Sequence, residues 1–266
     1  MNFRTRYGKW AIVAGASEGL GAAYAERLAS RGLNLVLVAR RSELLESLAS
    51  QLSTKYQVEI KTIVQDLSAP DAAEQTLRNI LDNEIGLLIY NAAFSAIGPF
   101  LGRSLDDHLK EIHTNAFTPL KLIYLVSQQM LERRRGGIVL MSSLSAFQGS
   151  AYISAYSATK AFNIVLAEGL WEECREHGVD VLACVSGAVH TPNYIASEPE
   201  PTGGLGDMTM NPEQVVREAF DALGKRPYVI PGRVNRLASF VMRHLLPRKA
   251  AIQFMGRVLR RKYVDV

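Results

Sequence analysis

The sequence has little that would mark an exported, metal-binding or membrane-spanning protein. It contains two cysteines, Cys174 and Cys184, which we interpret as reduced packing residues because one pair without neighbouring histidines makes a poor zinc site. The five histidines show no metal-ligand spacing, so we expect no metal. No apolar run reaches the roughly 18 residues of a membrane span, and the polar start MNFRTR is unlike a secretory signal. We therefore expect a cytoplasmic protein.

Positive charge is in clear excess only at the C-terminal end of the chain. The formal net charge is +4, and residues 233–266 carry nine lysines or arginines against one acidic residue. No nucleic-acid-binding motif accompanies them, so we expect no nucleic-acid partner. Apolar residues recur at helical spacing on both sides of Pro247, which predicts two amphipathic helices. This tail could pack against another subunit, cover a pocket or make peripheral contact with an anionic membrane.

Short apolar runs alternate with segments of helical periodicity along the rest of the chain. Strands separated by helices, without hairpin dipeptides, favour parallel pairing through right-handed crossovers. The sequence thus predicts an α/β fold, a doubly wound Rossmann-type parallel sheet of about seven strands flanked by helices. We expect one catalytic domain over 1–232 and a basic helical tail over 233–266 packed on it. The expected strands are 10–14, 35–39, 59–64, 86–90, 137–141, 179–185 and 228–230, and the clearest helices are 21–31, 42–55, 104–132 and 154–177.

A glycine-rich turn follows the first expected strand. Gly15, Gly19 and Gly21 stand in the order AGASEGLG and open the first expected helix. Glycine lets the backbone approach a pyrophosphate, and a helix N-terminus presents free N–H groups and a positive dipole end to it. Three glycines alone could form an ordinary tight loop, but their position between strand and helix favours a dinucleotide site. We assign Leu20 to the same site.

The end of the second expected strand distinguishes NADP from NAD. NAD sites place an acidic residue there for the ribose hydroxyls, whereas NADP sites need a cation for the 2′-phosphate. Here Ala39 holds the acidic position and Arg40 and Arg41 follow. We therefore expect NADP(H), with Arg40 as the phosphate-binding fork and Ser17 as a hydroxyl partner. The alternative is that the arginines only cap the strand and solubilise the next helix. Asp66, after the third strand, is placed to accept a hydrogen bond from the adenine amino group.

Ser143, Tyr156 and Lys160 form the most specific pattern in the chain. Tyr156 and Lys160 are four residues apart near the start of an expected helix and share one face, while Ser143 ends the preceding strand. Open α/β sheets bind their ligands at that edge. Together with the glycine turn, these residues resemble those of the short-chain dehydrogenase/reductase family, in its single-domain branch with Gly-xxx-Gly-x-Gly spacing. The resemblance covers about residues 8–232.

The resemblance implies a role for each of these residues. Tyr156 exchanges a proton with the carbonyl or alcohol oxygen, Lys160 favours the phenolate and holds the nicotinamide ribose, and Ser143 binds the developing alkoxide. Asn115, within the expected helix 104–132, matches the family's asparagine that supports a water relay to the lysine. The resemblance also implies cofactor contacts at Leu67, Asn91, Val189 and Thr191, in addition to Tyr156 and Lys160.

Two short segments depart from the family pattern. The family's Asn-Asn-Ala-Gly after the fourth strand reads Tyr90-Asn91-Ala92-Ala93 here, and its Pro-Gly after the sixth strand reads Ser186-Gly187. We expect these changes to adjust cofactor contacts without disabling the site, because every group with a chemical role is retained.

The residues expected around the substrate are mainly apolar and aromatic, with few charges that would bind a carboxylate or phosphate. We therefore expect an NADP(H)-dependent carbonyl reductase or alcohol dehydrogenase acting on an apolar ketone, aldehyde or secondary alcohol of lipid-like, acyl-chain or steroid type. The alternative is a catalytically idle NADP-binding redox sensor or scaffold. The resemblance also implies a homodimer or homotetramer packed through the two long helices. The expected substrate contacts are Ser143, Phe94, Phe147, Tyr152, His190 and Tyr194.

Overall fold

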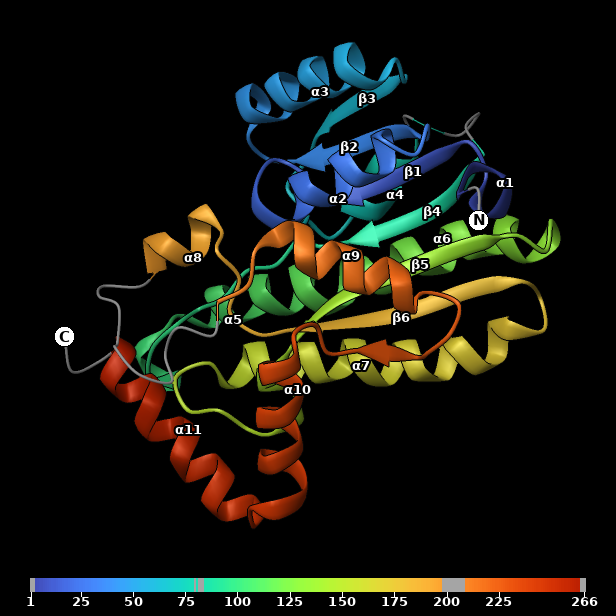
Figure 1. Cartoon of the computed structure of the whole chain (residues 1–266). Coiled ribbons are helices and arrows are strands. Elements are labelled where there is room, and N and C mark those ends of the chain that lie inside the picture. Colours follow the sequence, from blue (N-terminus) through green and yellow to red (C-terminus); the bar gives the residue numbers. More distant parts are fainter. Residues whose placement is uncertain (1–2, 79, 81–83, 198–208, 264–266) are drawn as a thin grey trace.

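The computed structural model describes residues 3–78, 80, 84–197 and 209–263. Its seven strands form one parallel sheet in the order β3-β2-β1-β4-β5-β6-β7 (Figure 1). The chain runs outward from β1 to β3, then returns to the other side of β1 and continues to β7, which is the doubly wound arrangement that the sequence predicts. The strands are β1 (Trp10–Ala14), β2 (Asn34–Ala39), β3 (Ile60–Val64), β4 (Ile85–Tyr90), β5 (Gly136–Ser143), β6 (Val179–Ser186) and β7 (Tyr228–Val229).

Two layers of helices cover the sheet, because alternate strand residues point to opposite faces and both faces are apolar. In β1, Ala11 and Val13 join the core on one face, and Ile12 and Ala14 join the core on the other. The first layer contains α2 (Gly19–Ala29), α3 (Ser42–Tyr56) and α9 (Pro212–Ala222), and the second contains α4 (Ala72–Arg78), α6 (Thr118–Glu132) and α7 (Ser154–Arg175). Shorter helices are α1 (Phe3–Tyr7), α8 (Pro192–Ser197) and the 3₁₀ turns Phe100–Gly102 and Leu144–Phe147.

The helix expected over 104–132 is divided into two. A π-helical turn, His113–Phe117, joins α5 (Leu105–Ile112) to α6. Around this turn the Tyr90 hydroxyl donates to the Thr114 carbonyl (2.6 Å), and the Asn115 side chain bonds the backbone of Phe94. These side-chain bonds stabilise a wider turn that the apolar periodicity does not reveal. The last strand is also shorter than the expected 228–230.

The tail forms a helical hairpin that projects from the sheet (Figure 1). It consists of α10 (Arg233–Phe240), a π-helical turn (Val241–Leu245) and α11 (Arg248–Tyr263). Arg236 pairs with Glu218 at 2.9 Å, and Arg248 donates to the Phe147 carbonyl at 3.0 Å. Leu237 is nevertheless 65% exposed, so part of the apolar face of α10 stays open. Among the described residues, no helix is long and apolar enough to cross a membrane.

Candidate active site

The glycine turn between β1 and α2 is packed too tightly for side chains. A Cβ at Gly15 would lie 2.6 Å from the Ala92 nitrogen, and one at Gly21 would lie 1.9 Å from the Gly15 carbonyl oxygen. Gly15 and Gly19 also have φ angles of 80° and 57°, which side-chain-bearing residues rarely adopt. A Cβ at Gly19 would meet Thr191 Cγ2 at 2.8 Å. The structure therefore brings Gly19 and Thr191, two residues predicted to contact the cofactor, into proximity.

The start of α2 fits a dinucleotide pyrophosphate. Its N-cap residue, Glu18, makes no side-chain capping hydrogen bond, so that side chain does not satisfy the first amide groups of the helix. The helix is 11 residues long and directs its positive dipole end at the glycine turn. Leu20, in its first turn, is half-buried. Free amide groups beside a backbone without Cβ atoms are the combination that a phosphate group requires.

At the end of β2, the structure places Arg41 rather than Arg40 against Ser17. The Arg41 guanidinium donates to Ser17 Oγ (3.0 Å) and pairs with Glu18 Oε1 (2.6 Å). Arg40 is exposed at the end of the strand. The sequence predicted only Arg40 as the phosphate-binding residue. The contact of Arg41 with Ser17 depends on the direction of its side chain in the folded turn, which two adjacent arginines in a sequence do not show.

Asp66 is ionised and partly fixed by its own turn. Burial alone would raise the pKa of its carboxyl group, but two hydrogen bonds from Ser68 and the charges of Arg40 and Lys110 outweigh that effect and hold the pKa below its usual value. The two bonds, from the backbone nitrogen and the hydroxyl of Ser68, are 3.0 and 2.8 Å long. A carboxylate in this state accepts hydrogen bonds, as the predicted adenine contact requires.

The other predicted cofactor residues lie along the same edge of the sheet. Asn91, just after β4, donates through Nδ2 to the Gly15 carbonyl at 2.9 Å, so it supports the glycine turn directly. Leu67 is buried, and its carbonyl accepts from the Thr118 hydroxyl at 2.9 Å. Val189 is buried after β6 and forms an isolated bridge with Met210. The position of these residues at one edge is compatible with the contacts that the resemblance implied.

Tyr156 is half-buried in the first turn of α7 and keeps its proton. Its pKa is raised to about 12, chiefly by burial and also by the charges of Glu111 and Tyr263, while a hydrogen bond with Ser143 acts in the opposite direction. Ser143, at the end of β5, also accepts from the backbone nitrogen and hydroxyl of Ser145 at 3.3 and 3.1 Å. The predicted serine and tyrosine are thus in contact, and the phenol is in the form that donates a proton.

Lys160 lies one helical turn after Tyr156 and is only 3% exposed. Its amino group donates to the Met141 carbonyl at 3.1 Å and lies 5.5 Å from the centre of the Tyr156 ring. Burial lowers the pKa of Lys160 to about 8, and the charge of Glu111 opposes that change. The lysine therefore remains mostly protonated near neutral pH, although its charge is barely hydrated.

Asn115 is fully buried, and its amide joins the loop after β4 to α7. Its Oδ1 accepts from the Phe94 nitrogen (2.9 Å), and its Nδ2 donates to the Phe94 carbonyl (2.8 Å) and to the Thr159 hydroxyl (3.2 Å). Thr159 precedes Lys160 in α7. The side chain thus positions the catalytic helix, and the water relay that the resemblance implied stays a prediction.

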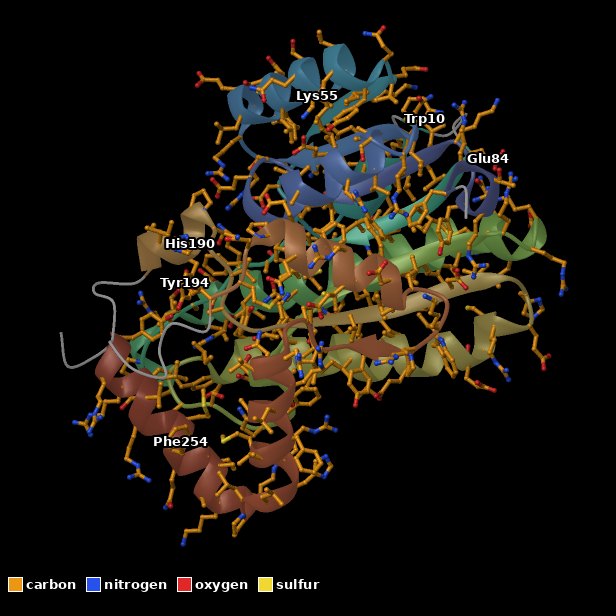
Figure 2. The ribbon with its side chains drawn as sticks, in the orientation of Figure 1. Trp10, Lys55, Glu84, His190, Tyr194 and Phe254 are labelled. Carbon is orange, nitrogen blue, oxygen red and sulfur yellow. The ribbon has the colours of Figure 1, made fainter. Side chains whose placement is uncertain are left out.

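The predicted substrate residues divide into two groups. Phe94 and Tyr152 are half-buried in neighbouring loops, which are joined by a 2.8 Å bond from the Gly98 nitrogen to the Tyr152 carbonyl. Tyr152 has a φ of 66°, a strained value of the kind that often occurs at binding sites. His190 lies just before α8 and is exposed, and Tyr194 lies within α8 (Figure 2).

Phe147, the remaining predicted substrate contact, lies towards the tail. Its ring is 4.1 Å from the Arg243 guanidinium and packs edge-on against Tyr228 at 6.3 Å. Its substrate contact therefore stays a prediction.

Three residues near the site escaped the sequence reasoning. Glu111 and Tyr263 are close enough to Tyr156 for their charges to raise its pKa, and Arg41 contacts Ser17. Glu111 had a local signal, since an acidic residue four positions before Asn115 shares its helix face. Tyr263 had none, because nothing in a local pattern shows where the end of α11 folds back.

The chain belongs to the short chain dehydrogenase family, whose model matches residues 9–201. It is similar to the 7beta-hydroxysteroid dehydrogenase of Clostridium sardiniense, with 35% identity over 89% of this chain and 90% of that protein. A structure from a study of 7beta-hydroxysteroid dehydrogenase stereoselectivity matches with a TM-score of 0.89 and 32% identity, covering 96% of this chain and 99% of the other. A Sphingobium yanoikuyae short-chain dehydrogenase in complex with NADPH matches with a TM-score of 0.75 and 28% identity, covering 87% and 92%.

The family match confirms the family that the sequence predicted, and the structural similarity confirms the predicted fold class. It also makes the chain an oxidoreductase that acts on CH–OH and C=O groups. Ser143, Tyr156 and Lys160 lie close together in the structure and carry the kinds of acid–base group that this chemistry needs.

Gly21→Ala should weaken cofactor binding while the sheet stays folded. The new Cβ would lie 1.9 Å from the Gly15 carbonyl oxygen, so the turn must open where the pyrophosphate binds. We expect the Kd for NADPH, measured by fluorescence titration, to rise about tenfold or more. Gly169→Ala on α7 is the matched control, since its Cβ would meet nothing within 4 Å. Unchanged affinity in Gly21→Ala, with native circular dichroism, would contradict the assignment of the turn.

Proposed function

We propose that this enzyme reduces a bulky, largely apolar ketone, or oxidises the corresponding secondary alcohol, with NADP(H). The observation that carries the proposal is the state of the catalytic group. Tyr156 is half-buried, protonated and hydrogen-bonded to Ser143, and the buried Lys160 lies one helical turn away. A proton donor beside a hydroxyl that can hold the substrate oxygen is what carbonyl reduction requires.

The roles of the side chains follow from their positions. NADPH, when bound, supplies the hydride for the carbonyl carbon. Ser143 donates a hydrogen bond to the substrate oxygen and keeps it near Tyr156, whose hydroxyl gives its proton to that oxygen as negative charge develops. Lys160, as a buried cation, stabilises the phenolate that remains. In alcohol oxidation the same groups act in reverse, with Tyr156 accepting the proton.

The cofactor is NADP(H). Ala39 occupies the position where NAD sites carry an acidic residue, Arg40 is exposed just after β2, and Arg41 contacts Ser17 of the glycine turn. The NADPH complex of the Sphingobium relative supports the same choice. Arg40 is the residue that we assign to the 2′-phosphate, with Arg41 fixing Ser17 next to it.

A hydroxysteroid or its ketone is the best-supported substrate class. The Clostridium sardiniense relative is named for this activity, and its similarity extends over nine tenths of both chains. Phe94, Tyr152 and Tyr194 offer aromatic surface near the catalytic residues, and the end of α11 brings Tyr263 close enough to act on Tyr156. Aromatic side chains of this kind suit a large, flat, weakly polar molecule.

The rival interpretation is an idle NADP-binding sensor or scaffold. It would gain support from the loss of a catalytic group, but Ser143, Tyr156 and Lys160 are all present and close together. The enzyme interpretation is therefore preferred, and the rival becomes an outcome of the assay described next.

Tyr156→Phe should abolish turnover without abolishing cofactor binding. Wild type should oxidise NADPH with hydroxysteroid-derived ketones and other bulky ketones, and the variant, which lacks the proton donor, should be slower by about a thousandfold or more. The absorbance of NADPH reports turnover, and its fluorescence reports binding. Tyr56→Phe, on α3, is the matched control. Wild-type rates in Tyr156→Phe would refute the mechanism, and tight NADPH binding without turnover on any ketone would favour the idle sensor.

Arg40→Ala should reduce the preference for NADPH over NADH. Loss of a charge-assisted bond to the 2′-phosphate should raise the KM for NADPH about tenfold and leave the KM for NADH unchanged. Arg41→Ala, compared in the same assay, shows whether the adjacent guanidinium shares the role. Arg78→Ala, at an exposed position on α4, serves as the control. If only Arg41→Ala changes the preference, the phosphate contact belongs to Arg41.

We also propose that the enzyme forms a homodimer or homotetramer through α6 and α7. Large apolar side chains are exposed along these helices and the turn before α6, a pattern typical of subunit interfaces. The set comprises Phe117, Leu120, Tyr124, Phe162 and Val165. These helices lie next to each other on one face of the sheet (Figure 1).

Val165→Glu should break this association. Val165 is 67% exposed on α7, and a carboxylate there would have to lose its hydration at the interface. We expect the mass measured by light scattering during gel filtration to fall to that of one chain. Val64→Glu, at an exposed position on the outer strand β3, should leave the mass unchanged. An unchanged mass in Val165→Glu would move the interface elsewhere.

The tail and the cellular location complete the proposal. We assign 233–266 to the same folding unit as 1–232, supported by the contacts of Arg236 with Glu218 and of Arg248 with Phe147. Free, buried Cys174 and Cys184 suit the reducing cytoplasm. Peripheral membrane contact through the basic tail stays a prediction.

A further inference from the structure

A buried carboxylate on α5, a helix that packs against α7, has no part in the mechanism described above. Glu111, in the last turn of α5, is 1% exposed. Its Oε1 accepts a 3.1 Å hydrogen bond from the Ala96 nitrogen in the loop after β4. One neutral N–H donor compensates only part of the cost of burying a carboxylate. The fold therefore places a costly group here and holds its side chain in one position.

The positive charge of Lys160 is also costly to bury. It is a buried cation whose amino group donates to the neutral Met141 carbonyl. Within the described ranges, no carboxylate forms an ion pair with it. A buried charge is stabilised by an opposite charge nearby. Where little water screens the interaction, the opposite charge acts even without direct contact.

The fold fixes the position of Glu111 relative to α7. Glu111 precedes Asn115 by four residues, and Asn115 reaches α7 through its bond to the Thr159 hydroxyl. Thr159 is the residue before Lys160. The same stretch of chain that anchors the catalytic helix thus carries the carboxylate, so their separation changes little with substrate or solvent.

We propose that Glu111 is the counter-ion of Lys160 and holds the catalytic group in the protonated state that carbonyl reduction uses. This inference rests on the proposed function, and Glu111 is a positioning residue that acts through Lys160 and Tyr156. Its negative charge favours the ammonium form of the lysine and disfavours the phenolate form of the tyrosine.

The charged groups that face Glu111 come from two elements. On α5 itself, His108 lies three residues earlier, with Nε2 donating to the Phe100 carbonyl at 2.9 Å and its Nδ1 buried without a partner among the described residues. On α7, Lys160 faces the carboxylate. The loop after β4 contributes only the neutral Ala96 N–H. Burial raises the pKa of Glu111, while Ala96, His108 and Lys160 act to lower it.

These charges fix the direction in which Glu111 shifts the pKa of Lys160. With Glu111 ionised, the pKa of Lys160 is about 8, so reduction should lose rate as pH rises through that value. Removing the negative charge leaves burial unopposed and moves the pKa of Lys160 lower. The alkaline limb of the pH profile must then move to lower pH, whereas loss of a merely structural contact would lower the rate equally at every pH.

The decisive comparison is Glu111→Gln against wild type, in kcat/KM for ketone reduction between pH 6 and pH 10. Glutamine keeps an oxygen for the Ala96 nitrogen and removes only the charge. We expect the alkaline limb to move down by about one pH unit, so that activity above the limb falls about tenfold. Glu173→Gln, exposed on α7, and His108→Gln, which changes another side chain near Glu111 and leaves its carboxylate in place, should leave the limb in place. An unmoved limb in an active Glu111→Gln enzyme would overturn the inference and leave the proposed function intact.

A second measurement does not depend on turnover. Lys160 has a lower pKa in the folded protein than in the unfolded chain, about 8 against 10.5, so its charge opposes folding fully below pH 8 and not at all well above 10.5. If Glu111 offsets that cost, Glu111→Gln should lower the urea midpoint more at pH 7 than at pH 10. An equal decrease at both pH values would refute the counter-ion role. Should glutamine prevent folding, Glu111→Asp and Glu111→Asn provide a second pair that differs only in charge.

Discussion

The parallel pairing of β1 with β4, and of β4 with β5, is the constraint on which the site depends. Parallel strands end at the same edge, and the register puts Ala14 beside Tyr90. The glycine turn after β1, Asn91 after β4 and Ser143 at the end of β5 therefore meet without any long connection. The bond from Asn91 to the Gly15 carbonyl then fixes the turn to the neighbouring strand. Cofactor site and catalytic site share this edge, so a change that shifts one strand would disturb both.

The exclusion of water from this edge of the sheet determines the protonation states of its side chains. Burial lowers the pKa of Lys160 to about 8 and raises that of Tyr156 to about 12. Each change favours the neutral form of the side chain. In such surroundings a charge that is not in contact still matters, because little water screens it. Glu111 can therefore influence both groups while its own hydrogen bond goes to Ala96. The catalytic group is better described as three coupled ionisable side chains than as an isolated pair.

The features that could be predicted from the sequence are those that leave a local pattern. Continuous apolar runs predicted the strands, and the glycine spacing and the Tyr156–Lys160 pair predicted residues that the structure brings to one edge of the sheet. The π-helical turn at Asn115 left no such pattern, because bonds from Tyr90 and to Phe94 create it. The choice between Arg40 and Arg41 depends on side-chain direction rather than composition. Tyr263 approaches Tyr156 only through the tertiary fold of the tail.

The exclusion of water from the site relates the kind of substrate it suits to the protonation state of Tyr156. An apolar substrate is bound well only by a pocket with little water, and such a pocket raises the pKa of Tyr156. At pH 7 a pKa of about 12 makes ionisation of the phenol cost about 7 kcal/mol before cofactor or substrate is bound. Alcohol oxidation needs Tyr156 to accept a proton, whereas carbonyl reduction starts from the protonated form already present. The negative charge of Glu111 increases this difference, so burial and this charge together favour the protonated tyrosine from which carbonyl reduction starts.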